Sequence, residues 1–384
     1  MFDDLAALAD DPEAIFQRVA RSLVSAGELH RLFDLRLMQE RRRLGLPLDR
    51  RTNIDDVEEP LRSKLEASYL AACREVGELF LEAGQLREAW MYLRPAGDKL
   101  PVRAHMARVT PADDKVDELI ELALYEAIDP ERGYAWLLGR QGTCSAITTL
   151  DGLGPQLGIA DLKACAAVLV RHVYGELRGN LRGHLSRLKP EAATDLSVAE
   201  LVEKHPELLA GGNYHLDASH LASTVRYGRL LTERALVAQA LEIAEYGSQL
   251  PADMQYPGEA PFEELYRAHR LLFQATLGQN VDEAIDYFGA KARAAVEDPQ
   301  STTAIETYLI LLARTGRHGE ALEAFAELAP RDRQLSPHAP TLLALANQSG
   351  AWDRYEAICR ERGDLLGFAA GMLLRAASPT GDSR

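Results

Sequence analysis

The chain alternates between segments with apolar residues at helical spacing and short segments rich in glycine, proline and polar residues. Alanine and leucine dominate the periodic segments, runs of β-branched residues are scarce, and most prolines and glycines fall between the helical periods. Alanine and leucine favour helix, and a spacing of three to four residues places apolar side chains on one helix face. The sequence therefore predicts an all-α protein without a sheet.

Two stretches near the C-terminus carry the same pattern 34 residues apart, with Gly316 and Gly350 at equivalent places between two helical periods. Glycine can end a helix in the left-handed conformation at little cost, and the residue five positions later, Ala321 or Tyr355, can pack the next helix against the first. One such hairpin cannot bury its apolar face alone. The pattern therefore predicts an α-solenoid of stacked helical hairpins.

The clearest copy of the pattern lies earlier in the chain and is marked by four spaced residues, which are Gly77, Phe80, Ala89 and Pro101. Their spacing is similar to that of the tetratricopeptide repeat, so the segment resembles that family. Cys73 and Leu93 depart from the pattern, since they replace the usual tryptophan and the usual aromatic residue. Degenerate copies run through Gly228 and Ala240 and, with one residue too many, through Gly278 and Ala284. The resemblance implies a scaffold whose concave groove binds a peptide or a protein partner.

The distribution of these copies predicts five parts of the chain. They are an N-terminal helical segment at 1–60, a repeat-like hairpin at 61–110, a central helical segment at 111–212, repeat-like helices at 213–378 and a disordered tail at 379–384. The central segment is expected to contain a glycine-rich turn at 139–144 and a long helix at about 159–188. Whether it is a separate domain stays open.

Charge and cysteine content narrow the possible partners. With 43 basic and 58 acidic residues, the formal charge of −15 repels nucleic acids and anionic membranes. The four cysteines lie far apart, which argues against a zinc knuckle or a disulfide framework. No secretory signal and no window near the ~18 apolar residues of a membrane span are present in the sequence. We expect a cytoplasmic protein that binds neither nucleic acid nor membrane.

One cluster of residues has the composition of a metal site. His215, Asp217 and His220 lie where a glycine-containing loop meets a helix start, and His172 and Glu176 share one face of the long helix. Imidazole and carboxylate are ligands of divalent transition metals such as zinc, iron or manganese. The five residues predict a site whose metal-bound water would act as a nucleophile. In the alternative interpretation, Asp217 or Ser219 caps the helix, His215 satisfies a loop carbonyl and His220 packs.

Basic residues are unusually dense around the same region of this acidic chain. Six lie on the long helix and two follow the histidine cluster: Lys163, Arg171, Arg178, Arg182, Arg187, Lys189, Arg226 and Arg229. We take Arg171, Arg226 and Arg229 as candidate ligand-binding residues, because arginine holds carboxylates and phosphates in a bidentate manner. A solvated helix face with internal ion pairs would explain the same residues. If these arginines line the concave side, the ligand should be acidic, as a peptide or as a small anion.

Two functional hypotheses follow from the sequence. The first is a helical scaffold resembling tetratricopeptide-repeat proteins, which binds a protein or peptide partner. The second is a metal-dependent enzyme of hydrolase or lyase type, which acts on an anionic substrate with its site on a helical-repeat scaffold. The sequence identifies no catalytic residue beyond the candidate metal ligands.

Metal content separates these hypotheses. If the metal site exists, protein purified without chelator or histidine tag should contain near-stoichiometric metal, and the His215→Ala/His220→Ala variant should lose it while retaining its helicity. Elemental analysis and circular dichroism measure the two properties. A folded, metal-free protein would favour the scaffold.

Overall fold

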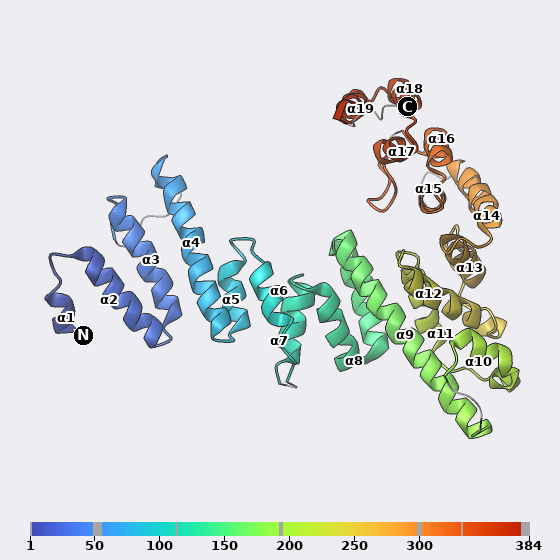
Figure 1. The fold of residues 1–384 in the computed structure, drawn as a ribbon, viewed down its shortest axis with the longest axis horizontal. Helices are drawn as coiled ribbons and strands as arrows, with labels where there is room; N and C mark the ends of the chain where they lie inside the picture. The colour runs from blue at the N-terminus through green and yellow to red at the C-terminus, as the bar shows by residue number, and fades with distance from the viewer. Residues whose placement is uncertain are drawn as a thin grey trace, which may run out of the picture. The chain divides into compact units, whose positions relative to one another are not determined.

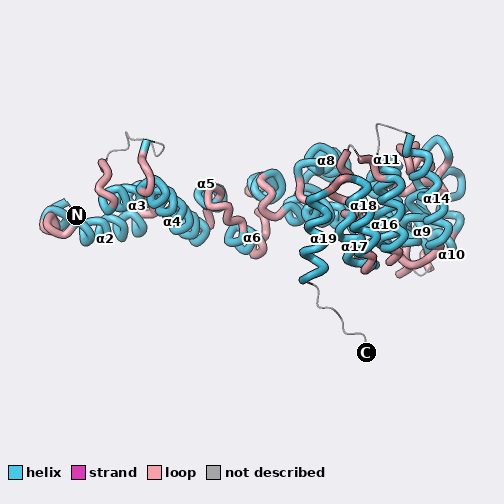
Figure 2. Tube along the Cα trace, turned by 90° about the horizontal axis from the view of Figure 1, so that it is seen from above, coloured by secondary structure: helices cyan, strands magenta, loops and turns pink. Residues whose placement is uncertain are grey.

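The computed structural model describes residues 2–48, 56–112, 114–191, 195–297, 302–331 and 333–377 of the chain. Helices and loops make up these residues, and no strand occurs among them (Figure 2). The prediction of an all-α fold is therefore confirmed. Within the same residues, no helix is long and apolar enough to cross a membrane. The predicted tail at 379–384 lies outside the described residues.

The helices belong to two compact units, residues 1–140 and 141–384. The first unit contains α1 (Phe2–Ala6), α2 (Pro12–Ser25), α3 (Leu29–Arg43), α4 (Leu61–Glu82), α5 (Leu86–Leu93), α6 (Leu100–Met106), α7 (Val116–Ile120), a π-helical turn (Glu121–Tyr125) and the first part of α8 (Pro130–Leu153). The five-part division predicted from the sequence stays a prediction.

The second unit begins within α8 and is longer. It contains α9 (Ile159–Leu188), α10 (Val198–Lys204), α11 (Ala218–Gly228), α12 (Arg234–Gly247), α13 (Leu265–Thr276), α14 (Val281–Ala294), α15 (Thr303–Arg314), α16 (His318–Leu328), α17 (Leu342–Ser349), α18 (Trp352–Arg362) and α19 (Leu365–Ala377). Short 3₁₀ turns occur at Gly154–Gln156, Pro206–Gly212, Ala252–Met254 and Ala295–Glu297. Most neighbouring helices along the chain contact each other in both units, which is the packing of a helical repeat (Figure 1).

The glycine-to-alanine spacing marks the points where hairpin helices approach most closely. A Cβ atom on Gly77 of α4 would lie 2.6 Å from Leu93 Cγ and 3.3 Å from the Ala89 carbonyl oxygen, both on α5. A Cβ atom on Gly228 of α11 would lie 3.0 Å from Ala240 Cβ on α12. Because glycine has no side chain, the two backbones of each hairpin can come together at these positions.

A second set of glycines ends helices. Gly84, Gly316 and Gly350 have φ values of 71°, 77° and 70°, in the left-handed region that glycine adopts without strain. Each lies between the two helices of a hairpin, so the role predicted for Gly316 and Gly350 is confirmed. Gly142, with φ of 79°, interrupts α8. The predicted glycine-rich turn at 139–144 is thus one non-helical glycine between two helical halves.

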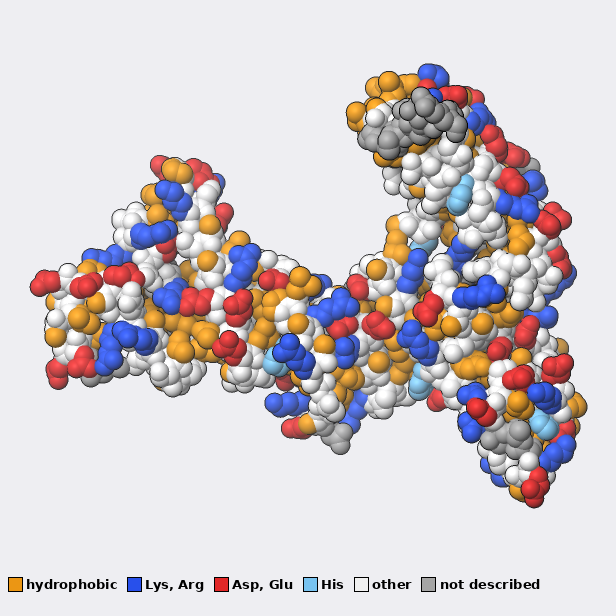
Figure 3. Space-filling model, viewed as in Figure 1, with side chains coloured by type: hydrophobic (Ala, Val, Ile, Leu, Met, Phe, Trp, Pro, Cys, Tyr) orange, Lys and Arg blue, Asp and Glu red, His pale blue; other side chains and the backbone are white. Residues whose placement is uncertain are grey.

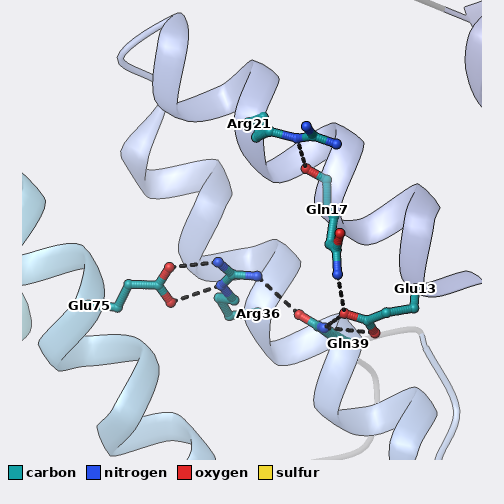
Figure 4. Close-up of polar contacts among 6 residues, drawn as sticks. All are labelled: Glu13, Gln17, Arg21, Arg36, Gln39 and Glu75. Carbon is teal, nitrogen blue, oxygen red and sulfur yellow. Dashed lines mark hydrogen bonds and ion pairs between the residues drawn. The ribbon is translucent and has the colours of Figure 1, made fainter.

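Polar contacts tie α2, α3 and α4 of the first unit together (Figure 4). Arg36 of α3 donates two hydrogen bonds to Glu75 of α4, at 2.8 Å from Nε and 2.6 Å from Nη2. Gln39 of α3 accepts from Arg36 Nη1 at 3.2 Å and donates to Glu13 of α2 at 3.1 Å. The arginine between these helices is therefore paired with a carboxylate of its own unit.

The helices of residues 141–384 form an arc. The long helix predicted at about 159–188 is confirmed as α9, which contacts α11 and α12. Helices α11, α13 and α15 contact one another in turn. Figure 1 shows α15 and α17 on the inner side of the arc and α14 and α16 on its outer side. The inner side is therefore built largely from the first helix of each hairpin.

We expect the Gly77→Ala variant to be less stable than the wild-type protein. The added methyl group would overlap Leu93, which is fully buried, and overpacking of this kind costs about 1–3 kcal/mol in the free energy of unfolding. Gly139→Ala is the matched control, since Gly139 lies in α8 of the same unit with open space around its Cα, and alanine should stabilise the helix there by about 0.5–1 kcal/mol. Urea unfolding followed by circular dichroism would measure both changes. Equal shifts in the two variants would contradict the close-contact role of Gly77.

Candidate functional site

Two adjoining cavities open in the hollow of the arc. The first, which we call the inner cavity, has a volume of about 340 Å³ and is lined by residues at or near the ends of α8, α9 and α11, by α13 and α15, and by the loop before α17. The second, the loop cavity, has a volume of about 410 Å³ and is lined by α11, α13 and the loop at 256–262. Both cavities share Arg226, Arg229, Phe262 and Thr303. Figure 3 shows Lys, Arg and His side chains in this hollow.

Four cationic side chains line the inner cavity: Lys163, Arg226, Arg229 and Arg314. Arg226 Nη2 donates a hydrogen bond to Ser223 Oγ at 2.8 Å, and the Arg229 guanidinium carbon lies 5.7 Å from the centre of the Phe262 ring. Across the described ranges, none of the four forms an ion pair with a carboxylate, and Arg314 has no hydrogen-bond partner either. The cavity thus holds positive charge that the surrounding protein does not neutralise by direct contact.

Partial desolvation acts on these cations. Burial lowers the pKa of Arg314 to about 10, and desolvation in the hollow, with the neighbouring charge of Arg226, lowers the pKa of Arg229. Both guanidinium groups still carry their charge at neutral pH. A charge that has lost part of its hydration gains more from an opposite charge than a fully hydrated one does. The inner cavity is therefore suited to an anion.

The two carboxylates of the inner cavity are bound by hydroxyl and amide donors. Tyr227 donates its phenolic proton to Asp151 Oδ1 at 2.7 Å. Glu306 accepts from the Ser336 amide at 2.9 Å and from Thr302 Oγ1 at 2.7 Å. Burial opposes the ionisation of Glu306, but the hydrogen bonds from Ser336 and Thr302 outweigh it and keep the pKa of this carboxyl below its usual value. These contacts leave the cationic groups available to a ligand.

The structure separates the three arginines that the sequence singled out. Arg226 and Arg229 line both cavities, whereas Arg171 lies outside them on α9, with Nη2 4.0 Å from Glu233 Oε2. Arg314 was missed by the sequence analysis, because it lies in a different hairpin and belongs to no motif. Arg314 reaches the same cavity as Arg229 only because α15 lies on the inner side of the arc.

His172 and Glu176, the helical pair of the predicted metal site, lie together on α9. His172 Nε2 is 3.4 Å from Glu176 Oε2, and Thr143 Oγ1 is 3.0 Å from each of these two atoms. The threonine hydroxyl donates to the carboxylate and can accept from the imidazole. The pair thus holds the start of the second half of α8 against α9.

The other three predicted metal ligands make contacts of their own. His215 Nε2 lies 2.8 Å from His184 Nδ1, and His215 Nδ1 lies 2.9 Å from the Tyr246 hydroxyl. Asp217 caps α11 by accepting from the Ser219 amide at 2.8 Å, which is one of the two caps that the alternative interpretation predicted. The carbonyl oxygen of His220 accepts from Thr224 Oγ1 at 2.7 Å.

In the described residues, the pair of His172 and Glu176 therefore makes contacts different from those of His215, Asp217 and His220. Among these residues, no group of three or more His, Cys, Asp or Glu side chains is placed to hold a metal ion. Burial and the neighbouring His184 lower the pKa of His215 to about 4, so its imidazole is neutral at pH 7. The metal site stays a prediction, to be decided by the metal content of the protein.

Comparison with known proteins adds no relative to this picture. No protein-family model matches the sequence, and no curated protein is similar enough in sequence to count as a match. The likeness to the tetratricopeptide repeat thus remains a resemblance, while the helical-repeat packing rests on the structure.

Beside the loop cavity, His269 of α13 is fully buried. Its Nδ1 lies 2.7 Å from the Leu265 carbonyl oxygen, and its ring stacks on Phe262 with 4.2 Å between the ring centres. Its Nε2 has no hydrogen-bond partner within the described ranges of the chain. Burial lowers the pKa of His269 to about 3, against the hydrogen bond to Leu265 and with help from the nearby Arg229. The folded protein therefore keeps this imidazole neutral.

This burial predicts a loss of stability in acid. The unfolded chain takes up a proton on residue 269 near pH 6.5, whereas the folded chain does so only near pH 3, so the unfolded state binds more protons between these values. The free energy of unfolding should fall with decreasing pH in this window, with His269 contributing at most about 1.4 kcal/mol per pH unit. His215 acts in the same direction down to about pH 4.

The His269→Phe variant should show a shallower dependence on pH, because phenylalanine fills the site without titrating. Urea unfolding at pH 5, 6, 7 and 8 would measure the slope for both proteins, and the value at pH 8 corrects for the change in packing. An unchanged slope would show that His269 is not held neutral in the folded protein.

Proposed function

We propose that the protein is a helical-repeat scaffold that binds an acidic peptide segment of a protein partner in the hollow of residues 141–384. One observation carries this proposal. Arg226 and Arg229 lie at the junction of two adjoining cavities without a carboxylate partner in the described part of the chain. In a protein of formal charge −15, such a cationic hollow is the part of the surface that would attract an anionic segment.

The dimensions and lining of the hollow support a peptide ligand. Cavities of about 340 and 410 Å³ are each at the lower end of the range for ligand pockets, so together they would accept neighbouring side chains of one segment. The half-buried Leu162 and Ile310 provide apolar contact area in the inner cavity, and Arg226 and Arg229 provide donors for carboxylates. Stacked helical hairpins commonly present an extended inner surface for such ligands, and the resemblance to tetratricopeptide repeats implies the same use.

A cytoplasmic location belongs to this proposal. None of the four cysteines, all of which lie in the described part of the chain, forms a disulfide, and Cys73, Cys165 and Cys359 are buried. Cysteines outside disulfides are typical of proteins from a reducing compartment. The metal-dependent enzyme has no comparable support among the described residues and stays a separate prediction.

Binding of acidic peptides tests the proposal. A library of fluorescent peptides rich in Asp and Glu should bind the full-length protein, whereas the same library with Asn and Gln should not. The Arg226→Gln/Arg229→Gln variant should bind the acidic library at least about tenfold more weakly, because charge-assisted hydrogen bonds are lost. Fluorescence anisotropy at 50 and 300 mM salt measures the affinities, and binding should weaken at high salt.

Arg267→Gln is the matched control for loss of positive charge. Arg267 lies on α13 outside both cavities, where it pairs with Glu264 at 2.9 Å. This variant should bind the acidic library as the wild type does. Equal binding of the neutral library, or equal effects of the control and the double variant, would refute the proposed role of the hollow.

A further inference from the structure

The inner cavity carries more positive charge than a single carboxylate would neutralise. Its four cationic side chains face two carboxylates, Asp151 and Glu306, which leaves a formal excess of two positive charges. The loop cavity shares only Arg226 and Arg229 of the four cations, and Glu259 lies in its lining. The charge excess is therefore concentrated around Arg314 and Lys163, on the side of the hollow formed by α9 and α15.

The cations approach the inner cavity from three separate helices. Lys163 belongs to the first turns of α9, Arg226 and Arg229 to the end of α11, and Arg314 to the end of α15. Tyr227, Thr307 and Ser336 line the same space, but their hydroxyl protons are donated to Asp151, the Thr303 carbonyl oxygen and Glu306, so the donors left for a ligand are the cations. Donors that converge from several directions suit a tetrahedral group with three terminal oxygens better than a planar carboxylate, which offers two.

Charge and donor arrangement together select the ligand chemistry. A phosphate monoester carries a charge of about −1.5 to −2 at pH 7 and presents three strong acceptor oxygens. Its charge would balance the two excess positive charges of the inner cavity, whereas a single carboxylate would neutralise only one of them. Arg314 has no hydrogen-bond partner among the residues that the structure describes, and its guanidinium group can donate to two of these oxygens at once.

We propose that the inner cavity binds the dianion of a phosphate monoester, held by Arg226, Arg229, Arg314 and Lys163. This inference rests on the proposed function, since the phosphate would belong to a phosphorylated residue of the bound peptide segment. The half-buried apolar side chains of Leu162, Leu230 and Ile310, which line the same cavity as the cations, would contact the residue that carries the phosphate. The segment would continue past Arg229 into the loop cavity.

Two small probes of equal shape test the charge of the ligand. Phenyl phosphate and phenyl sulfate both present a tetrahedral group, but the sulfate carries one negative charge. In isothermal titration calorimetry with the full-length protein, phenyl phosphate should bind at one site and roughly tenfold or more tightly than phenyl sulfate. Arg314→Gln should weaken phenyl phosphate binding about tenfold or more, and Arg267→Gln should leave it unchanged.

Lys163→Gln provides a second test that does not alter α15. Like Arg314→Gln, this variant should bind phenyl phosphate more weakly than the wild type does. Circular dichroism of each variant verifies that it is folded. Equal binding of phenyl sulfate, or equal affinity of Arg314→Gln, Lys163→Gln and Arg267→Gln for phenyl phosphate, would overturn the dianion site.

Peptide libraries distinguish the source of the phosphate. A degenerate peptide library with a central phosphoserine should bind more tightly than the same library with serine or glutamate at that position, and Arg314→Gln should abolish the difference. If phenyl phosphate binds as expected but none of these libraries nor the acidic library binds, the dianion site stands with a small phosphate monoester as its ligand, and the peptide scaffold is refuted. If acidic peptides bind and a phosphate adds no affinity, the scaffold stands and the dianion site is refuted.

Discussion

Each helical hairpin of this protein depends on its neighbours to bury its apolar face. From α13 to α18 the core runs continuously through consecutive hairpins, with Phe288, Leu309, Leu345 and Ile358 fully buried. Small residues allow the two helices of a hairpin to approach closely. At the contact of α11 and α12, for example, Gly228 lies against Ala240. A repeat contacts only its neighbours, so the packing at each contact sets the direction of the helices that follow.

The same stacking determines where charge can collect. Helices α11, α13 and α15 contact one another along the inner side of the arc, and the end of α11 lies across the inner cavity from α15. The guanidinium group of Arg229 lies over the face of the Phe262 ring, where a cation is attracted by the electrons of the aromatic ring. The curvature of the arc therefore gathers cations from distant parts of the chain around one space.

Arg36 and the arginines of the inner cavity differ in their partners. In residues 1–140, Arg36 lies between α3 and α4 and donates two hydrogen bonds to Glu75, so its charge is satisfied within the unit. In the inner cavity, Asp151 and Glu306 are bound to hydroxyl and amide donors, and the guanidinium groups beside them remain unpaired in the described residues. An arginine paired in this way stabilises the fold, whereas one without a partner is available to a ligand. This difference places the candidate site in residues 141–384.

The sequence by itself determined features that depend on residues close along the chain. Apolar periodicity gave the bounds of α9, and glycine chemistry gave the turns at Gly316 and Gly350. The helix start after the glycine-containing loop limited its cap to Asp217 or Ser219, of which the structure shows Asp217. The tertiary structure decided which distant side chains meet. It placed His215 beside His184 and Tyr246, left Arg171 outside the two cavities and brought Arg314 to the cavity that Arg226 and Arg229 line. The physical reason is that helix and turn preferences act over a few residues, whereas the convergence of side chains depends on packing angles accumulated over several hairpins.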